Sequence, residues 1–369
     1  MTPRVSTTLL VSSLLDGESV LSLRERDWND LLLLAQRHGL LARLGTMLGE
    51  IGLCDQLPHK ARVRMRAACI AAESTQTAVR FEVNRALRAL EGIDTPIVLL
   101  KGAGYVMAGL PSARGRFVGD VDLMVPAAKI ELVERTLVEK GWVAADMEEY
   151  DQRYYRQWMH EVPPLTHAQR ETPIDLHHTI APRTSRVHPD AQALFAESVP
   201  LANPRLRVLA PADMVLHSAV HLLNDEVGKP LRDLFDLHDL IGHFGADPGF
   251  WDSLLVRARL HGLVRPLFYM LRYTHSLLGT PIPPHVERAV APLGPPRVMR
   301  PLMDSLFTAS FLPESPSRSR RALEFSRWLL YVRSHWLRMP PGLLARHLMV
   351  KAGRRLRERF EISPADRTA

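Results

Sequence analysis

Residues 93–181 have the pattern of short strands, whereas the chain on either side has the pattern of helices. This contrast limits the fold more than any other feature of the sequence. A helical pattern at 127–140 lies among apolar runs with the β-branched content and alternation of strands, at 96–100, 120–125, 142–145, 162–167 and 172–180. Strands and helices mixed over so short a span predict a small mixed sheet covered by helices.

The flanking regions are predicted to be helical. Residues 60–90 contain neither proline nor glycine, and Gly92 and Pro96 then stop the helix. Proline-rich stretches at 182–211 and 281–296 mark boundaries around further helices at 212–224, 230–244, 250–260 and 263–278. We therefore predict an α+β fold of four parts: an N-terminal helical region (1–92), an α/β core (93–181), a helical cleft-closing domain (182–295) and a basic helical appendage (296–369).

Composition excludes several classes of protein. Hydrophobic residues make up 46% and charged residues 24%, which is typical of a globular chain and not of a disordered or fibrous one. Two cysteines, Cys54 and Cys69, are too few for a disulfide framework or a cysteine-rich zinc site. No apolar run approaches the roughly 18 residues of a membrane span. The sequence therefore predicts a soluble, cytoplasmic protein.

The net charge of +7 has a local origin, because residues 296–369 carry 15 Lys/Arg against 6 Asp/Glu. Such an appendage suits an acidic partner or a nucleic acid, although a solvated helical face explains the charge equally well. Its aromatic residues stand between arginines at helical spacing, so stacking on bases and packing against the body of the protein are both open, and the spacing favours packing. These residues are Trp328, Tyr331 and Trp336, with Arg327, Arg333 and Arg338.

An aspartate pair carries the most chemical information. Alternation along 120–125 puts Asp120 and Asp122 on one face of the strand and the apolar residues on the other. Two adjacent carboxylates repel each other unless a cation lies between them, and Mg²⁺ is usually held by one or two carboxylates together with substrate phosphates. Asp-x-Asp alone is a weak motif.

A third carboxylate lies on another predicted strand. Within 172–180, alternation places Asp175 and His177 on one face. Three carboxylates on two adjacent strands can hold two Mg²⁺ ions and clamp a phosphorus centre for in-line displacement. The alternative is that Asp175 is simply paired with Arg170 or His177.

The turn at 99–104 is suited to phosphate. Gly102 lets backbone N–H groups approach an anion, and Lys101 adds a positive charge. Arg116, in the loop before the aspartates, can clamp a triphosphate. His217 and His221 are four residues apart on a predicted helix, a spacing that can bind zinc, but a structural or cleft-lining role is favoured. Arg232 and Asp236, also four apart, are interpreted as a helix-surface pair.

Together, the strings at 101–102, 116, 120–125 and 174–177 resemble the nucleotidyltransferases of the DNA polymerase β superfamily. More narrowly, they are similar to a bacterial nucleotidyltransferase family in which Lys-Gly replaces the usual Gly-Ser. The resemblance continues through 209–222 and 231–237 and covers about residues 20–280.

The resemblance implies Asp120, Asp122 and Asp175 as catalytic residues and ligands of Mg²⁺, with two ions expected and Mn²⁺ as a substitute. Asp175 would also help to deprotonate the attacking hydroxyl. Lys101, Gly102 and Arg116 would bind the triphosphate. Ala103 stands where the family has serine, and 17 residues separate Gly102 from Asp120.

The resemblance also implies the activity. A nucleoside monophosphate would pass from a nucleoside triphosphate to an acceptor, with release of pyrophosphate. The acceptor stays open among a small molecule, a peptide, a protein side chain and tRNA. Two other functions remain as alternatives: an Asp-x-Asp glycosyltransferase, which gives Asp175 no role, and a non-catalytic module that binds nucleotides or nucleic acid.

Overall fold

The computed structural model describes residues 6–224, 228–314, 319–346 and 349. Its centre is a seven-stranded mixed sheet with the strand order β3-β4-β5-β2-β1-β7-β6. The strands are β1 (Ile97–Leu99), β2 (Val121–Met124), β3 (Trp142–Ala144), β4 (Leu165–His167), β5 (Pro173–His177), β6 (Val199–Pro200) and β7 (Leu206–Val208). The predicted α+β fold with its small mixed sheet is confirmed.

Helices flank the sheet on both sides in sequence. The α-helices among the described residues are α1 (Thr7–Leu15), α2 (Glu25–Arg37), α3 (Leu41–Glu50), α4 (His59–Ala89), α5 (Lys101–Met107), α6 (Ile130–Glu139), α7 (Glu149–Trp158), α8 (Ala191–Glu197), α9 (Pro211–Asn224), α10 (Pro230–Phe244), α11 (Phe250–Leu260), α12 (Val264–Leu278), α13 (Pro284–Val290), α14 (Arg300–Phe311) and α15 (Arg320–Arg338). Among them, none combines the length and apolar character needed to span a membrane.

Strand β2 occupies the middle of the sheet. It pairs antiparallel with β1 and parallel with β5, and β1 pairs parallel with β7 on its other side. A central strand has neighbours on both edges and is covered on both faces, which is why every residue of β2 is buried. A polar side chain on β2 therefore has to find its partners inside the protein.

Several elements differ from the sequence prediction. The strand predicted at 162–167 is confined to β4, and the prolines at 163 and 164 explain its late start, since proline lacks the N–H of a ladder. The proline-rich stretch 182–211 contains α8, β6 and β7, and 281–296 contains α13. Strands of two or three residues are too short to show a period.

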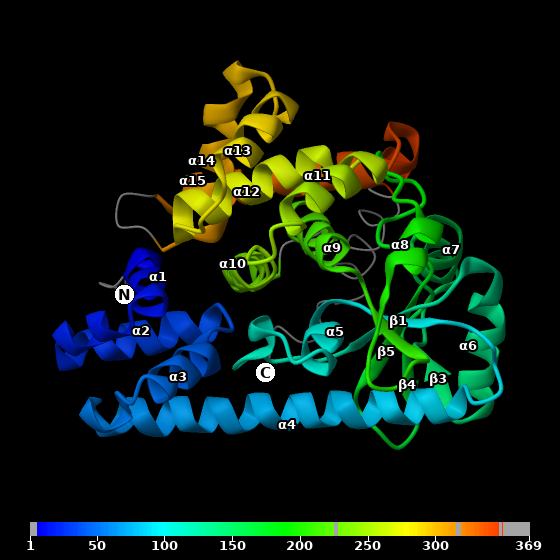
Figure 1. Ribbon diagram of the computed structural model, residues 1–369, viewed down its shortest axis with the longest axis horizontal. Helices are drawn as coiled ribbons and strands as arrows, with labels where there is room; N and C mark the ends of the chain where they lie inside the picture. The colour runs from blue at the N-terminus through cyan, green and yellow to red at the C-terminus, as the bar shows by residue number, and fades with distance from the viewer. Residues whose placement is uncertain (1–5, 225–227, 315–318, 347–348, 350–369) are drawn as a thin grey trace, which may run out of the picture.

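The long helix α4 connects the N-terminal helices to the sheet. Figure 1 shows it running beneath both along the length of the molecule. Near its end, Glu82 is 1% exposed and accepts hydrogen bonds from Trp142 Nε1 at 2.7 Å and from Arg170 Nε at 2.6 Å. The Arg170 guanidinium also lies 4.7 Å from the centre of the Trp142 ring. This buried cluster fastens α4 to the β3–β4 edge of the sheet.

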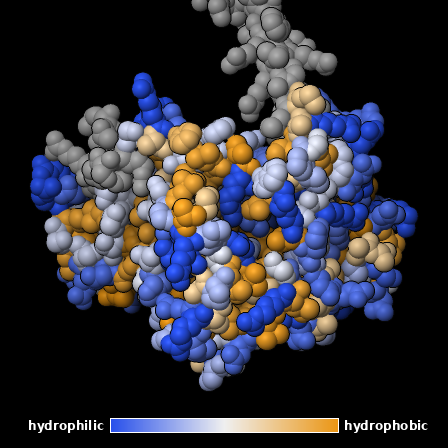
Figure 2. Space-filling model, turned by 90° about the horizontal axis from the view of Figure 1, so that it is seen from above, coloured by the Kyte–Doolittle hydropathy of each residue, from blue (hydrophilic) through white to orange (hydrophobic). Residues whose placement is uncertain are grey.

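The C-terminal helix α15 packs on the body of the protein. Arg333 Nη1 donates a hydrogen bond to the carbonyl of Leu223 at 2.6 Å, and its guanidinium lies over the rings of Tyr269 and Phe307. Phe325, Trp328 and Trp336 of the same helix are exposed. From above, apolar and hydrophilic groups are interspersed across this face (Figure 2). Residues 315–318, 347–348 and 350–369 of the predicted basic appendage lie outside the described residues.

We predict that Glu82→Ala lowers the free energy of unfolding by about 3 kcal/mol, because it leaves the buried end of Arg170 and the Trp142 N–H without an acceptor. Urea denaturation followed by circular dichroism measures this. Glu139→Ala, at an exposed position at the end of α6, is the matched control and should change stability by less than about 0.5 kcal/mol. Equal stabilities of the two variants would contradict the prediction.

Candidate functional site

Asp122 and Asp175 lie side by side on the two central parallel strands. Their Cα positions are register partners of β2 and β5, so their side chains leave the sheet on the same face. Asp120 precedes β2 by one residue and lies two positions before Asp122, and its charge and that of Asp122 act on each other. The structure thus brings together the three carboxylates that the alternation places on one face.

Asp122 is the most deeply placed of the three, at 3% exposure. Lys101 Nζ lies 3.2 Å from Asp122 Oδ1, and His177 Nε2 lies 2.9 Å from the same oxygen. Burial opposes ionisation, but Lys101 and the hydrogen bond from His177 outweigh it and hold the pKa of Asp122 well below its usual range. The same contact raises the pKa of His177 against the effect of its burial.

Lys101 reaches Asp122 from an unusual backbone conformation. Its φ is +41°, the one positive φ at a described residue other than glycine, and it marks the junction of β1 and α5. Side chains rarely adopt this region, which costs on the order of 1–3 kcal/mol and is found where surrounding structure imposes it. The ion pair with Asp122 is one such constraint.

Asp175 has the opposite electrostatic environment. Burial, followed by the charges of Asp122 and Glu161, raises its pKa to about 7. Burial and Asp122 also raise the pKa of Asp120, against the effect of Lys101. Two of the three carboxylates are therefore destabilised as anions. A divalent cation beside them would offset the repulsion between the carboxylate charges, so the oxygen donors on this face fit Mg²⁺.

Helix α9 faces this cluster. His217 is 2% exposed, and burial followed by the charges of Lys101 and His221 lowers its pKa well below the usual value, so that it is neutral. The charge of His221 in turn stabilises the Asp120 carboxylate. Both histidines belong to the wall of the site, which is the cleft-lining position favoured from sequence.

Arg116 and Asp236 form a buried pair across the site. Arg116 Nε donates to Asp236 Oδ2 at 2.7 Å, and the guanidinium lies 5.5 Å from the centre of the Tyr105 ring. The Arg232–Asp236 surface pair inferred from helical spacing is wrong: Arg232 bonds its neighbour Asp233, because Asp236 points inward from α10.

Gly102 makes room for that arginine. A Cβ at this position would overlap Arg116 Nη1 and lie 2.9 Å from Val118 Cγ1. The absence of a side chain at Gly102 therefore allows Arg116 to approach the turn where the triphosphate is expected.

Arg170, which the sequence offered as a partner of Asp175, is bound to Glu82 instead.

His160 and Glu161 border the site and were not identified from sequence. Glu161 Oε2 lies 3.4 Å from His177 Nε2, and the rings of His160 and His177 are 5.1 Å apart. Both residues belong to the loop before β4 and reach β5 through one isolated bridge between Glu161 and His177. A single bridge has no periodic signal.

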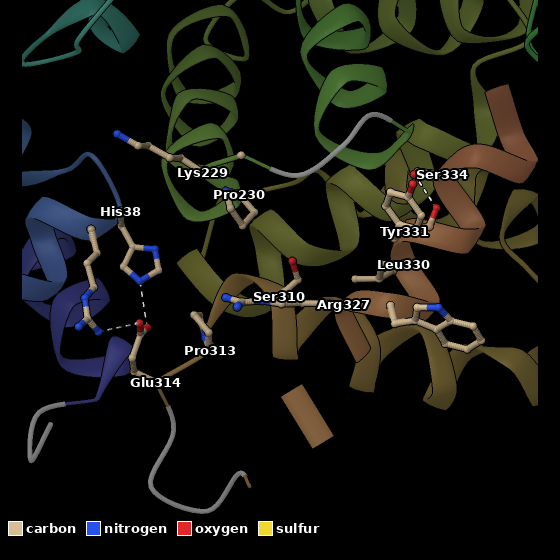
Figure 3. Close-up of a pocket in the computed structure, with 13 residues that line it drawn as sticks. His38, Lys229, Pro230, Ser310, Pro313, Glu314, Arg327, Leu330, Tyr331 and Ser334 are labelled. Atoms are coloured by element: carbon tan, nitrogen blue, oxygen red, sulfur yellow. Dashed lines mark hydrogen bonds and ion pairs between the residues drawn. The ribbon is translucent and has the colours of Figure 1, made fainter. Parts of the chain in front are cut away.

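A cavity with a volume of about 650 Å³ lies away from the carboxylates. Figure 3 shows Arg327 extending from α15 toward Ser310, and His38 bonded to Glu314 on the opposite wall. Lys229, at the start of α10, also borders it. None of the predicted metal-binding residues lines this cavity.

The fold and the carboxylate cluster together define an α+β protein built around a candidate cation centre. A family model described as uncharacterised nucleotidyltransferase matches residues 24–279, well over half of the chain. The chain therefore belongs to this nucleotidyltransferase family. No curated protein and no solved structure matches it.

We predict that the contribution of Asp175 to the stability of the cation-free protein falls as pH rises from about 4 to about 7. The folded state keeps a proton on Asp175 that the unfolded state has already released, so deprotonation within this window disfavours the fold. In chelator, Asp175→Asn should be more stable than the wild type by about 1–2 kcal/mol at pH 8 and equal to it near pH 4.

Chemical denaturation at the two pH values measures this difference. Asp146→Asn, at an exposed position, is the control. If Asp175→Asn brings no gain in stability at pH 8, the Asp175 carboxylate carries no penalty and the electrostatic account is wrong.

Proposed function

We propose that this protein is a Mg²⁺-dependent nucleotidyltransferase that transfers a nucleoside monophosphate from a nucleoside triphosphate, with release of pyrophosphate. The observation that carries the proposal is the placement of Asp122 and Asp175 as register partners on one face of the sheet, with Asp120 beside them. Membership of the nucleotidyltransferase family supports the same activity.

Asp120, Asp122 and Asp175 would hold Mg²⁺, which neutralises charge at the phosphates and orients them. Lys101 now lies against Asp122, where it balances a buried charge. A cation bound at Asp122 would take over that function and would allow Lys101 to turn to a phosphate oxygen. Gly102 and Arg116 form the other side of the phosphate site, and Arg116 supplies the donors that Ala103 lacks.

Asp175 is also suited to take a proton from the acceptor. Its pKa of about 7 lies near neutral pH, where a general base works best. Asp122 cannot do this, because Lys101 and His177 hold it ionised and engaged. Of the two register partners, both of which would hold the cation, Asp175 is therefore the one suited to exchange a proton as well.

A glycosyltransferase of the Asp-x-Asp type is the competing function. It uses Asp120 and Asp122 but gives Asp175 no role, although Asp175 lies on their face and their charges raise its pKa. Thermal-shift measurements with nucleotide sugars and free triphosphates, each with Mg²⁺ or Mn²⁺, distinguish the two. Stabilisation by nucleotide sugars alone would support the glycosyltransferase.

We predict that Asp120→Asn weakens Mg²⁺-dependent binding of a non-hydrolysable triphosphate at least about tenfold and stops nucleotidyl transfer. Asp120 is chosen because it is the most exposed of the three carboxylates, so the fold should tolerate this change best. Isothermal titration calorimetry measures binding, with Asp146→Asn as the control. Triphosphate binding by the wild type that persists unchanged in chelator would refute the metal assignment.

We propose that the cavity between α2, α10 and α15 binds a part of the acceptor that is remote from the hydroxyl reacting beside Asp175. Its basic lining includes Arg37, Lys229 and Arg327, its aromatic lining Trp328 and Tyr331, and Glu314 balances part of the charge. This lining favours a phosphate-bearing acceptor. Helix α10 links the two sites: it begins at this cavity and carries Asp236, the partner of Arg116, about 9 Å further along its axis.

We predict that Arg327→Glu weakens binding of a tRNA probe and lowers the slope of log affinity against log salt by about 1, because one phosphate contact is lost. Fluorescence anisotropy at several salt concentrations measures this. Arg321→Glu, on the same helix but outside the cavity, makes the same change in net charge. Equal effects of the two variants would show that the cavity has no specific part in binding.

A further inference from the structure

The loop before β4 is fixed against β5 by its backbone. His178 N donates to the carbonyl of His160 at 2.9 Å, and Val162 N donates to the carbonyl of Leu176 at 3.0 Å. Between these two bonds, Glu161 and His177 form an antiparallel bridge. Main-chain hydrogen bonds therefore hold the backbone of His160, Glu161 and His177 together.

Nitrogen and oxygen donors of these three residues converge. One ligand atom from each lies within 4.8 Å of the others. Glu161 Oε2 is 3.4 Å from His177 Nε2 and 4.0 Å from His160 Nε2. Donors around a tetrahedral ion with bonds of about 2.0–2.1 Å lie about 3.3 Å apart, so the first distance already fits and the second needs a small closure.

Asp122 borders this group through His177. Asp122 Oδ1 lies 2.9 Å from His177 Nε2, which is also the ring atom that lies 3.4 Å from Glu161 Oε2. The group is well enclosed, since His160 and His177 are 7% and 0% exposed and the Glu161 side chain is 18% exposed. The donors of His160, Glu161 and His177 therefore surround an enclosed position that suits a cation.

We propose that His160, Glu161 and His177 form a three-ligand zinc site beside the oxygen-only site expected to hold Mg²⁺, with water as the fourth ligand. Two imidazoles and one carboxylate are a donor set that catalytic zinc sites use, whereas Mg²⁺ takes oxygen donors almost exclusively. Zinc on His177 Nε2 would replace the hydrogen bond from this atom to Asp122, so the two sites would be neighbours that share no ligand.

The site is tested by zinc binding without any nucleotide. Protein is stripped with chelator, equilibrated with Zn²⁺ in millimolar Mg²⁺, and desalted, and bound zinc is measured by mass spectrometry. One zinc per chain is expected for the wild type. His160→Ala and Glu161→Gln should weaken zinc binding at least about a hundredfold, since loss of outer-shell partners alone costs 10- to 100-fold.

His188→Ala, at an exposed histidine outside the group, is the matched control and should keep its zinc. Glu161→Gln preserves shape, so its loss of zinc cannot be ascribed to misfolding; circular dichroism in chelator checks both variants. Substitution with Co²⁺ gives a visible spectrum of nitrogen and oxygen ligation, and a strong thiolate band would instead place the ion at Cys54 or Cys69.

Asp120→Asn separates this proposal from the proposed function. It should keep zinc while losing Mg²⁺-dependent triphosphate binding. Failure of triphosphate binding in the wild type, with zinc retained, would overturn the transferase and leave the zinc site standing. The zinc proposal is wrong if the wild type keeps no zinc, if His160→Ala and His188→Ala keep it equally, or if Asp120→Asn loses it together with His160→Ala.

Discussion

The buried charge of Asp122 is the constraint on which the rest of the site depends. A carboxylate at 3% exposure costs several kcal/mol unless it is paired, and here Lys101 and His177 both pair with it. Those partners come from the β1–α5 junction and from β5, the two neighbours of β2. The strand order around β2 and the left-handed backbone conformation of Lys101 thus each place a partner beside the buried carboxylate of Asp122.

A second buried pair connects the helical region to this centre. The loop between Gly102 and Asp120 is long, yet it is fixed from both sides. Gln76 of α4 donates to the carbonyl of Arg116 at 2.9 Å, and the Arg116 side chain is bound to Asp236 of α10. Helices before and after the sheet in sequence therefore determine where Arg116 lies. A change in the position of α10 would be transmitted to the phosphate side of the site.

The sequence predicted what depends on short-range periods. Alternation placed Asp122 and His177 correctly because a strand period of two holds over a few residues. The Arg232–Asp236 pair failed because helical spacing says which residues are neighbours but not which face is buried. His160 and Glu161 could not be found, since one isolated bridge brings them to β5. Long-range pairing of a loop leaves no pattern in its own residues.

Asp122 and Asp175 lie on one face of the sheet but have opposite pKa shifts, because their neighbouring charges differ. Asp122 faces Lys101 and His177, which outweigh its burial, whereas Asp175 is buried and faces Asp122 and Glu161. Two carboxylates whose pKa values are shifted apart allow one site to hold a fixed anion and a proton acceptor at the same pH. A cation bound at Asp122 or at Asp175 would change the electrostatics of both residues, because the charge of Asp122 is one cause of the raised pKa of Asp175. Binding at the metal centre and basicity at Asp175 are therefore coupled through Asp122.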